Sequence, residues 1–285
     1  MITRKMVPVH DLELHVSTYG VFEKSVPVVI VHGFMDHHMA WEEIALFLSD
    51  KGMPVISYDH RGHGRSSHVA SSSQYHFPDY ISDLHRLLEV LNVSKCHLVG
   101  HSMGGTIASI FASVFPNLVQ KLFLIEGLGP PNENKEESFQ RLRRHFYQRT
   151  RLVQHKIYPS ISDLCNRIQR VYPYIPNEQA GIFANYLGIE IKSGGWMWRY
   201  DIRHKDAAAI SFHSGRHIEL LSHIKAPTYL LFGQESWYIN LSDIQNRIQV
   251  LSNCVEIQNF DCGHNPHLEC PQQLSEWLIQ RAFLT

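Results

Sequence analysis

A serine in a G-x-S-x-G pattern is the side chain of this sequence best suited to chemistry. Positions 100–104 read Gly-His-Ser-Met-Gly, with a short apolar run at 96–99 before them and small apolar residues at 105–115 after them. A strand, a sharp turn and a helix are the context in which such a serine becomes a nucleophile. The glycines permit the turn, and the helix N-terminus favours developing negative charge. Ser102 is therefore the candidate nucleophile.

A nucleophilic serine needs a base, and the chain offers 20 His to choose from. In a nucleophile-elbow arrangement the histidine follows the last strand of the sheet. His264 lies just after the last predicted strand, at residues 255–260. We therefore predict His264 as the base, with His267 as the alternative.

The oxyanion formed during acyl transfer needs two backbone N–H donors. The residue after the nucleophile and a loop after an earlier strand supply them in such folds. Here these are the amides of Met103 and Phe34. His32 and His101, beside them in sequence, are candidate substrate contacts.

The acid that would orient the base has no obvious place. After the strand expected at 228–232 we would look for Gly-x-x-Asp, but Ser236 stands in the acid position. A serine cannot stabilise an imidazolium as a carboxylate does. Glu126 ends the strand that follows the serine helix, at the sheet edge where ligands bind in open α/β folds, and it is the favoured acid. The remaining alternatives are Glu235, Asp261, Asp243 or no acid at all.

Strand and helix patterns alternate along most of the chain, which predicts a mostly parallel sheet covered by helices on both faces. Strands are expected at 12–19, 26–31, 55–58, 96–99, 121–125, 228–232 and 255–260, and helices at 39–50, 80–91, 105–115 and 272–283. The rhythm breaks after Pro130, where the pattern becomes helical and irregular. We expect a core of residues 1–129 and 223–285, with a helical lid inserted at 130–222.

Two features of this lid segment have two interpretations each. Trp196 and Trp198 could line an acyl or aromatic pocket, or anchor the lid to the core. Residues 139–156 carry five Arg and one Lys without an acid. They could attract an anionic substrate or a membrane surface, or form a solvated face of the lid.

Composition excludes several classes of protein. A net charge of −1 over 285 residues indicates no nucleic-acid partner. Five Cys without a C-x-x-C pattern indicate free thiols in a reducing compartment, so we expect a cytoplasmic protein. No signal peptide and no run of 18 apolar residues is visible, so no integral membrane association is expected. No spacing matches a His or carboxylate metal motif, and we expect neither a metal nor a cofactor.

Four motifs in this order resemble the α/β-hydrolase superfamily over essentially the whole chain. They are His32-Gly33-Phe34, residues 59–66, residues 100–104, and Gly263-His264 followed by Glu269 and Pro271. Residues 124–130, 193–196 and 198–199 are similar to its serine-hydrolase-like subgroup. Related branches, including haloalkane dehalogenases, carry their acid after this same strand, which supports Glu126. Dehalogenases use Asp as nucleophile, so Ser102 argues against dehalogenation.

The resemblance implies a hydrolase of the α/β-hydrolase fold that acts on a small-molecule ester or thioester. We expect a serine hydrolase that releases a small or medium hydrophobic acyl group through Ser102, His264 and Glu126. One alternative is a C–C bond or lactone hydrolase using the same three residues. The other is a non-catalytic binding protein of the same fold, suggested by Ser236.

Overall fold

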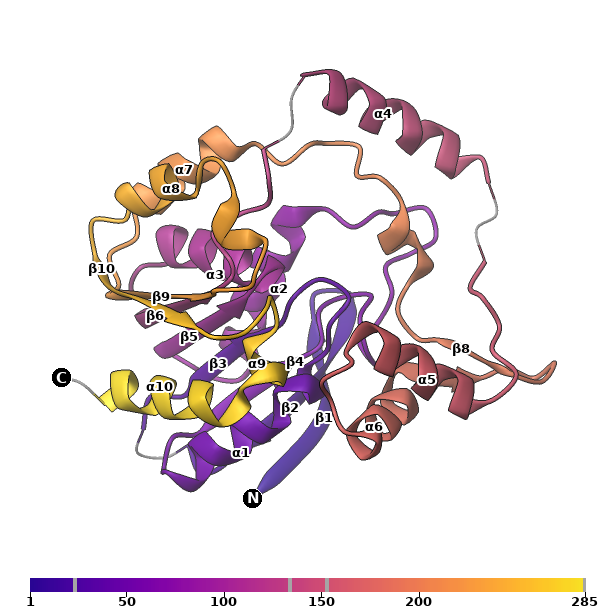
Figure 1. The fold of residues 1–285 in the computed structure, drawn as a ribbon, viewed down its shortest axis with the longest axis horizontal. Coiled ribbons are helices and arrows are strands. Elements are labelled where there is room, and N and C mark those ends of the chain that lie inside the picture. Colours follow the sequence, from indigo (N-terminus) through magenta and orange to yellow (C-terminus); the bar gives the residue numbers. More distant parts are fainter. Residues whose placement is uncertain (23–24, 133–134, 152–153, 284–285) are drawn as a thin grey trace.

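An eight-stranded sheet lies at the centre of the computed structural model, which describes residues 1–22, 25–132, 135–151 and 154–283 (Figure 1). The strand order is β1-β2-β4-β3-β5-β6-β9-β10. The strands are β1 Ile2–Val9, β2 Leu12–Tyr19, β3 Val28–Val31, β4 Val55–Tyr58, β5 Cys96–His101, β6 Val119–Ile125, β9 Thr228–Gly233 and β10 Cys254–Phe260. From β4 to β10 all neighbours are parallel, whereas β1 and β2 are antiparallel to their neighbours. The predicted fold class, a mostly parallel sheet covered by helices, is confirmed.

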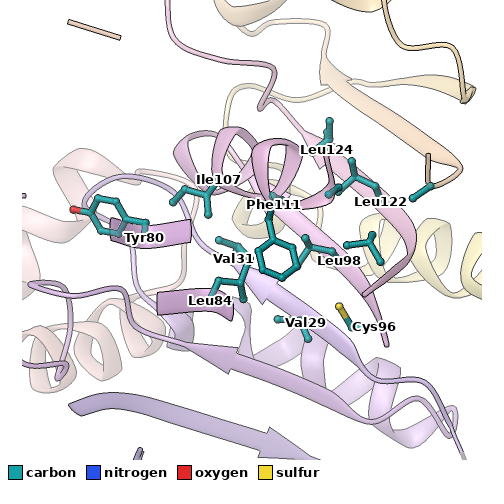
Figure 2. Close-up of a cluster of buried hydrophobic side chains, with 14 of the residues drawn as sticks. Val29, Val31, Tyr80, Leu84, Cys96, Leu98, Ile107, Phe111, Leu122 and Leu124 are labelled. Carbon is teal, nitrogen blue, oxygen red and sulfur yellow. The ribbon is translucent and has the colours of Figure 1, made fainter. Parts of the chain in front are cut away.

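The helices cover both faces of the sheet because continuous apolar strands must be buried on both sides. They are η1 His38–Trp41, α1 Glu42–Asp50, α2 Phe77–Val90, α3 Met103–Val114, α7 Ser214–Ser222, η3 Tyr238–Asn240, α8 Ile244–Gln249, α9 Pro266–Glu269 and α10 Pro271–Phe283. Residues of α2, α3, α7 and α8 share one buried cluster, part of which Figure 2 shows around Phe111. Residues of α1 and α10 share the other.

The predicted elements agree with the structure to within a few residues. The strand expected at 26–31 begins at Val28, after Pro27, which has no N–H to donate. The helix expected at 39–50 begins as the short 3₁₀ turn η1 before α1. Strand β1 was not predicted, and the antiparallel ladder that it forms with β2 defines it.

The described residues of the predicted lid, 130–222, form three α-helices, a small hairpin and a 3₁₀ turn before α7. These are α4 Lys135–Arg149, α5 Ile161–Val171, α6 Asn177–Leu187, β7 Gly188–Glu190, β8 Trp196–Trp198 and η2 Ile202–Lys205. Helices α5 and α6 share the buried cluster of α1 and α10. The Tyr186 hydroxyl of α6 donates to the buried carboxylate of Asp59. This contact fastens the lid to the loop after β4.

Helix α7 lies against α3 rather than with the other lid elements (Figure 1). His217 of α7 is buried, and its Nε2 lies 2.9 Å from the Ser109 hydroxyl of α3. We propose that the inserted lid ends before α7, which begins at Ser214, rather than at the predicted boundary of 222.

Candidate active site

Ser102 occupies a strained turn between β5 and α3. Its backbone has φ +52° and ψ −115°, a conformation that few non-glycine residues adopt. Gly104 makes the turn possible because a Cβ there would lie 2.0 Å from the carbonyl oxygen of Val31. The strand and the helix therefore meet closely, and Ser102 remains half-buried beside the carboxyl ends of the parallel strands.

His264 lies in the loop between β10 and α9, opposite Ser102. Its Nε2 is 3.1 Å from Ser102 Oγ. The side chain is 21% exposed, so the contact is not sealed within the core. His101 Nε2 donates to the carbonyl oxygen of His264 at 2.8 Å, which holds the loop in place.

Glu126, at the end of β6, faces the other nitrogen of His264. Its Oε2 is 2.8 Å from His264 Nδ1, and the residue is fully buried. Its Oε1 accepts the Gly233 N–H at 2.6 Å, and Oε2 also accepts the Ser236 hydroxyl. Three donors thus surround a carboxylate that has no access to water, which is the requirement for keeping a buried charge.

The other candidate acids do not reach His264. Glu235 and Asp261 are exposed. Asp243 accepts from Arg247 Nε at 2.8 Å in α8. Ser236, in the expected acid position, supports Glu126 instead: its hydroxyl donates to the carboxylate and accepts the Tyr238 N–H at 3.1 Å.

The predicted oxyanion donors flank the nucleophile. Met103 is the first residue of α3, so its N–H has no acceptor within the helix. Phe34 follows Gly33, where a Cβ would lie 3.4 Å from Ser102 Cβ. The buried ring of His32 shapes this loop: its Nδ1 donates to the Gly33 carbonyl at 2.7 Å, and its Nε2 accepts the His60 N–H at 3.0 Å.

His32 and His101 are buried at 0% and 2% exposure, so neither ring is open to a substrate. Burial lowers the pKa of both rings, which keeps them neutral. Their hydrogen bonds run to the oxyanion loop and to the loop of His264. We propose that both are positioning residues and not the substrate contacts that the sequence predicted.

Trp196 and Trp198 lie in β8, which Figure 1 shows beside α5. The Trp198 indole N–H donates to the Tyr158 hydroxyl at 3.3 Å, and the Trp196 backbone pairs with that of Tyr158. These contacts lie within the lid. Because they join residues of the same predicted segment, they do not decide between the two interpretations, and both stay predictions.

Two aromatic rings near the site were not considered as substrate contacts from the sequence: Phe34 was selected only for its backbone N–H, and Trp237 was not selected. The exposed ring of Trp237 is 5.2 Å from that of His264. Phe34 is half exposed, and its ring makes a T-shaped contact with that of His204 in η2, with 6.0 Å between the ring centroids. Trp237 directly follows Ser236, which stands where the acid was expected. An aromatic residue at that place was the signal by which the sequence could have identified it.

Two groups within the described part of the chain have side chains close enough to share a metal ion. In the first, His15, His38 and Asp59 are joined by hydrogen bonds and by Tyr186. In the second, Asp36, His101 and His267 lie behind the triad, with His267 Nε2 3.3 Å from Asp36. Serine-based acyl transfer needs no metal, and we assign none to either group.

Comparison with known proteins places this geometry in context. Residues 26–271 match a family model described as alpha/beta hydrolase fold. A zebrafish (Danio rerio) protein named sn-1-specific diacylglycerol lipase ABHD11 is 30% identical over 264 residues, covering 89% of this chain and 78% of the relative. A zebrafish serine hydrolase-like protein is 24% identical over 218 residues, covering 74% of this chain and 66% of the relative.

Among solved structures, the thioesterase domain from the curacin biosynthetic pathway superimposes with a TM-score of 0.87. It is 25% identical, and the match covers 98% of this chain and 99% of that one. No helix among the described residues is long and apolar enough to cross a bilayer.

Proposed function

Because the chain belongs to the alpha/beta-hydrolase fold family and is an esterase-like hydrolase, we propose that it cleaves carboxylic esters or thioesters with a small or medium hydrophobic acyl group. The observation that carries the proposal is one continuous line of contacts. Ser102 Oγ lies 3.1 Å from His264 Nε2, and His264 Nδ1 lies 2.8 Å from Glu126. A nucleophile, a base and an orienting carboxylate are thus in contact.

In the first half of the reaction, Ser102 Oγ attacks the carbonyl carbon while its proton passes to His264 Nε2. The bond between that carbon and the alcohol oxygen or thiol sulfur then breaks. The leaving group takes the proton from His264 Nε2 and departs, which leaves the acyl group on Ser102. Glu126 stabilises the imidazolium and holds its Nδ1–H.

In the second half, a water molecule takes the place of the serine hydroxyl as the nucleophile and attacks the acyl group. His264 Nε2 removes a proton as the water oxygen bonds to the acyl carbon. The bond from that carbon to Ser102 Oγ then breaks, and the proton returns to Oγ. The carboxylic acid is released and the triad is restored.

The Phe34 and Met103 amides stabilise the negative oxygen of both tetrahedral intermediates. Removal of one such donor costs about 3 kcal/mol of transition-state stabilisation in other serine hydrolases. The α3 N-terminus adds a favourable dipole at the same place. The exposed rings of Phe34 and Trp237 support a hydrophobic acyl group.

A panel of p-nitrophenyl esters and acyl thioesters, with acyl chains of two to twelve carbons, tests the proposal. We expect turnover that is highest for short or medium chains and absent in Ser102→Ala. Lactones and 1,3-diketones on the same plate test the cleavage of other bonds. Turnover of these compounds with none of the esters or thioesters would overturn the proposal.

A further inference from the structure

Helix α4 presents its polar side to the protein. Figure 1 shows it at the periphery of the molecule, beyond α7 and the chain that follows β8. His145 is buried, and its Nδ1 lies 2.8 Å from the carbonyl oxygen of Ala207. Gln148 accepts the Ala207 N–H at 2.7 Å. The Ser211 hydroxyl also donates to that of Ser138 at 3.2 Å, so polar side chains of α4 bond to the segment 207–211.

The apolar side of α4 faces solvent. Phe139, Leu142 and Phe146 are three and four residues apart, so they share one face of the helix. They are 60%, 41% and 61% exposed, and Tyr147 beside them is 57% exposed. A surface helix ordinarily buries its apolar face, and contiguous exposed patches of this kind mark interaction sites.

Arginines flank this apolar face. Arg143, Arg144 and Arg151 line a shallow hollow of about 460 Å³ together with Tyr147 and two glutamines, Gln140 and Gln148. No Asp or Glu occurs from residue 138 to residue 156. The hollow thus offers guanidinium and amide donors suited to phosphate oxygens.

The net charge of the predicted lid, residues 130–222, is opposite in sign to that of the rest of the chain. Residues 130–222 contain 14 Lys and Arg against nine Asp and Glu, a net charge of +5. The rest of the chain contains 12 against 18, a net charge of −6. An anionic surface would therefore attract the lid side of the molecule and repel the core side.

We propose that the outer face of α4 docks on an anionic phospholipid surface. Phe139, Leu142 and Phe146 enter the boundary between headgroups and acyl chains, and Arg143, Arg144 and Arg151 contact lipid phosphates. An exposed apolar stripe beside basic residues is the pattern of a helix that lies in the plane of a membrane surface. A soluble anion would use the arginines but would leave the aromatic face uncovered.

Sedimentation with sucrose-loaded vesicles tests this inference on the full chain. The vesicles contain phosphatidylcholine alone or with 30 mol% phosphatidylserine, at about 0.1 M salt. We expect at least tenfold stronger partitioning onto the anionic vesicles, weakened further at 0.5 M salt. Phe139→Ser/Phe146→Ser should reduce the partitioning more than tenfold. Arg143→Gln/Arg144→Gln should reduce it about 25-fold, from roughly fivefold per basic residue.

Two matched double variants serve as controls. Arg167→Gln/Arg170→Gln removes the same charge from exposed positions of α5. Val171→Ser/Ile182→Ser removes two exposed apolar side chains from other lid helices. Both should bind anionic vesicles within twofold of the unmodified protein. Hydrolysis of a soluble ester, measured on every variant, separates this inference from the proposed function.

Several outcomes would overturn the inference. The inference is wrong if the protein does not bind vesicles, or if binding does not depend on phosphatidylserine. It is also wrong if the control variants lose as much binding as the α4 variants. Loss of self-association in the phenylalanine variant, seen by sedimentation velocity without any vesicle binding, would assign the face to a second copy of the chain. If inorganic phosphate binds at these arginines while the protein does not bind vesicles, the hollow is assigned to a soluble anion.

Discussion

Replacing Glu126 by glutamine changes one atom and should reverse the tautomer of His264. Oε1 accepts the fixed Gly233 N–H at 2.6 Å, and Oε2 faces His264 Nδ1 at 2.8 Å. The amide oxygen must take the Oε1 position, because an NH₂ group there would oppose a buried N–H at a cost of about 1–3 kcal/mol. The NH₂ group then faces Nδ1, which becomes an acceptor.

The proton of His264 is thereby placed on Nε2, which lies 3.1 Å from Ser102 Oγ and can no longer accept the serine proton. The corresponding change in a Ser-His-Asp enzyme lowers kcat about 10⁴-fold while the geometry survives. At 1.36 kcal/mol per factor of ten, this is about 5 kcal/mol of transition-state stabilisation. We expect a loss of ~10³–10⁴-fold in kcat for Glu126→Gln.

The assay is kcat and KM on a soluble p-nitrophenyl ester, with the melting temperature as a check on folding. Glu235→Gln is the matched control, since Glu235 is an exposed carboxylate in the same loop as Ser236. It should retain kcat within twofold. A loss below tenfold in Glu126→Gln, or an equal loss in the control, would refute the assignment of the acid.

Three further predictions concern the supports of the site and the fold. Ser236→Ala removes a donor from Glu126, and we expect about a tenfold lower kcat at unchanged KM; an unchanged kcat would contradict the positioning role. Tyr186→Phe removes a donor from buried Asp59, and urea unfolding should show about 1–3 kcal/mol less stability with kcat/KM within threefold. Burial lowers the pKa of His217 to about 3, so the unfolded chain binds its proton first and stability falls as pH drops below 6.5. The free energy of unfolding should fall about 2 kcal/mol less between pH 7 and pH 5 in His217→Gln than in the unmodified protein, and equal losses would contradict this linkage.

The central strands could be predicted because burial on both faces makes them continuous apolar runs. Val55–Tyr58 is entirely buried, and it was predicted with the bounds that the structure has. Ile2–Val9 has exposed residues at its first five positions and lies at the sheet edge. Its strand character comes from pairing with Leu12–Tyr19, which is a tertiary property.

The three candidate triad residues could be selected from the sequence because each follows a predicted strand, in the order typical of this fold. Ser102, Glu126 and His264 each end or follow a strand, and parallel strands bring their carboxyl ends to one edge. The contact of Ser236 with Glu126 depends on how the loop after β9 folds back toward β6, which no local pattern encodes. The position of Trp237 over His264 depends on the same loop.

The lid is where local pattern was least informative. Two tryptophans in a predicted lid suggest either a substrate pocket or an anchor, and the contact of Trp198 with Tyr158 could not be read from the sequence. The basic stretch of α4 was visible in the sequence, whereas its orientation was not. The burial of His145 and the exposure of Phe139, Leu142 and Phe146 in the structure show which side of this helix faces outward.

Labelling by a fluorophosphonate probe tests the central claim most directly, because the probe reacts with a serine only when base and oxyanion donors activate it. The purified protein is incubated with the probe, and the modified peptide is identified by mass spectrometry. The account predicts stoichiometric labelling on Ser102, none in Ser102→Ala, and strongly slowed labelling in His264→Ala. A folded protein that stays unlabelled with small and large probes alike, or that is labelled at another serine, would contradict it.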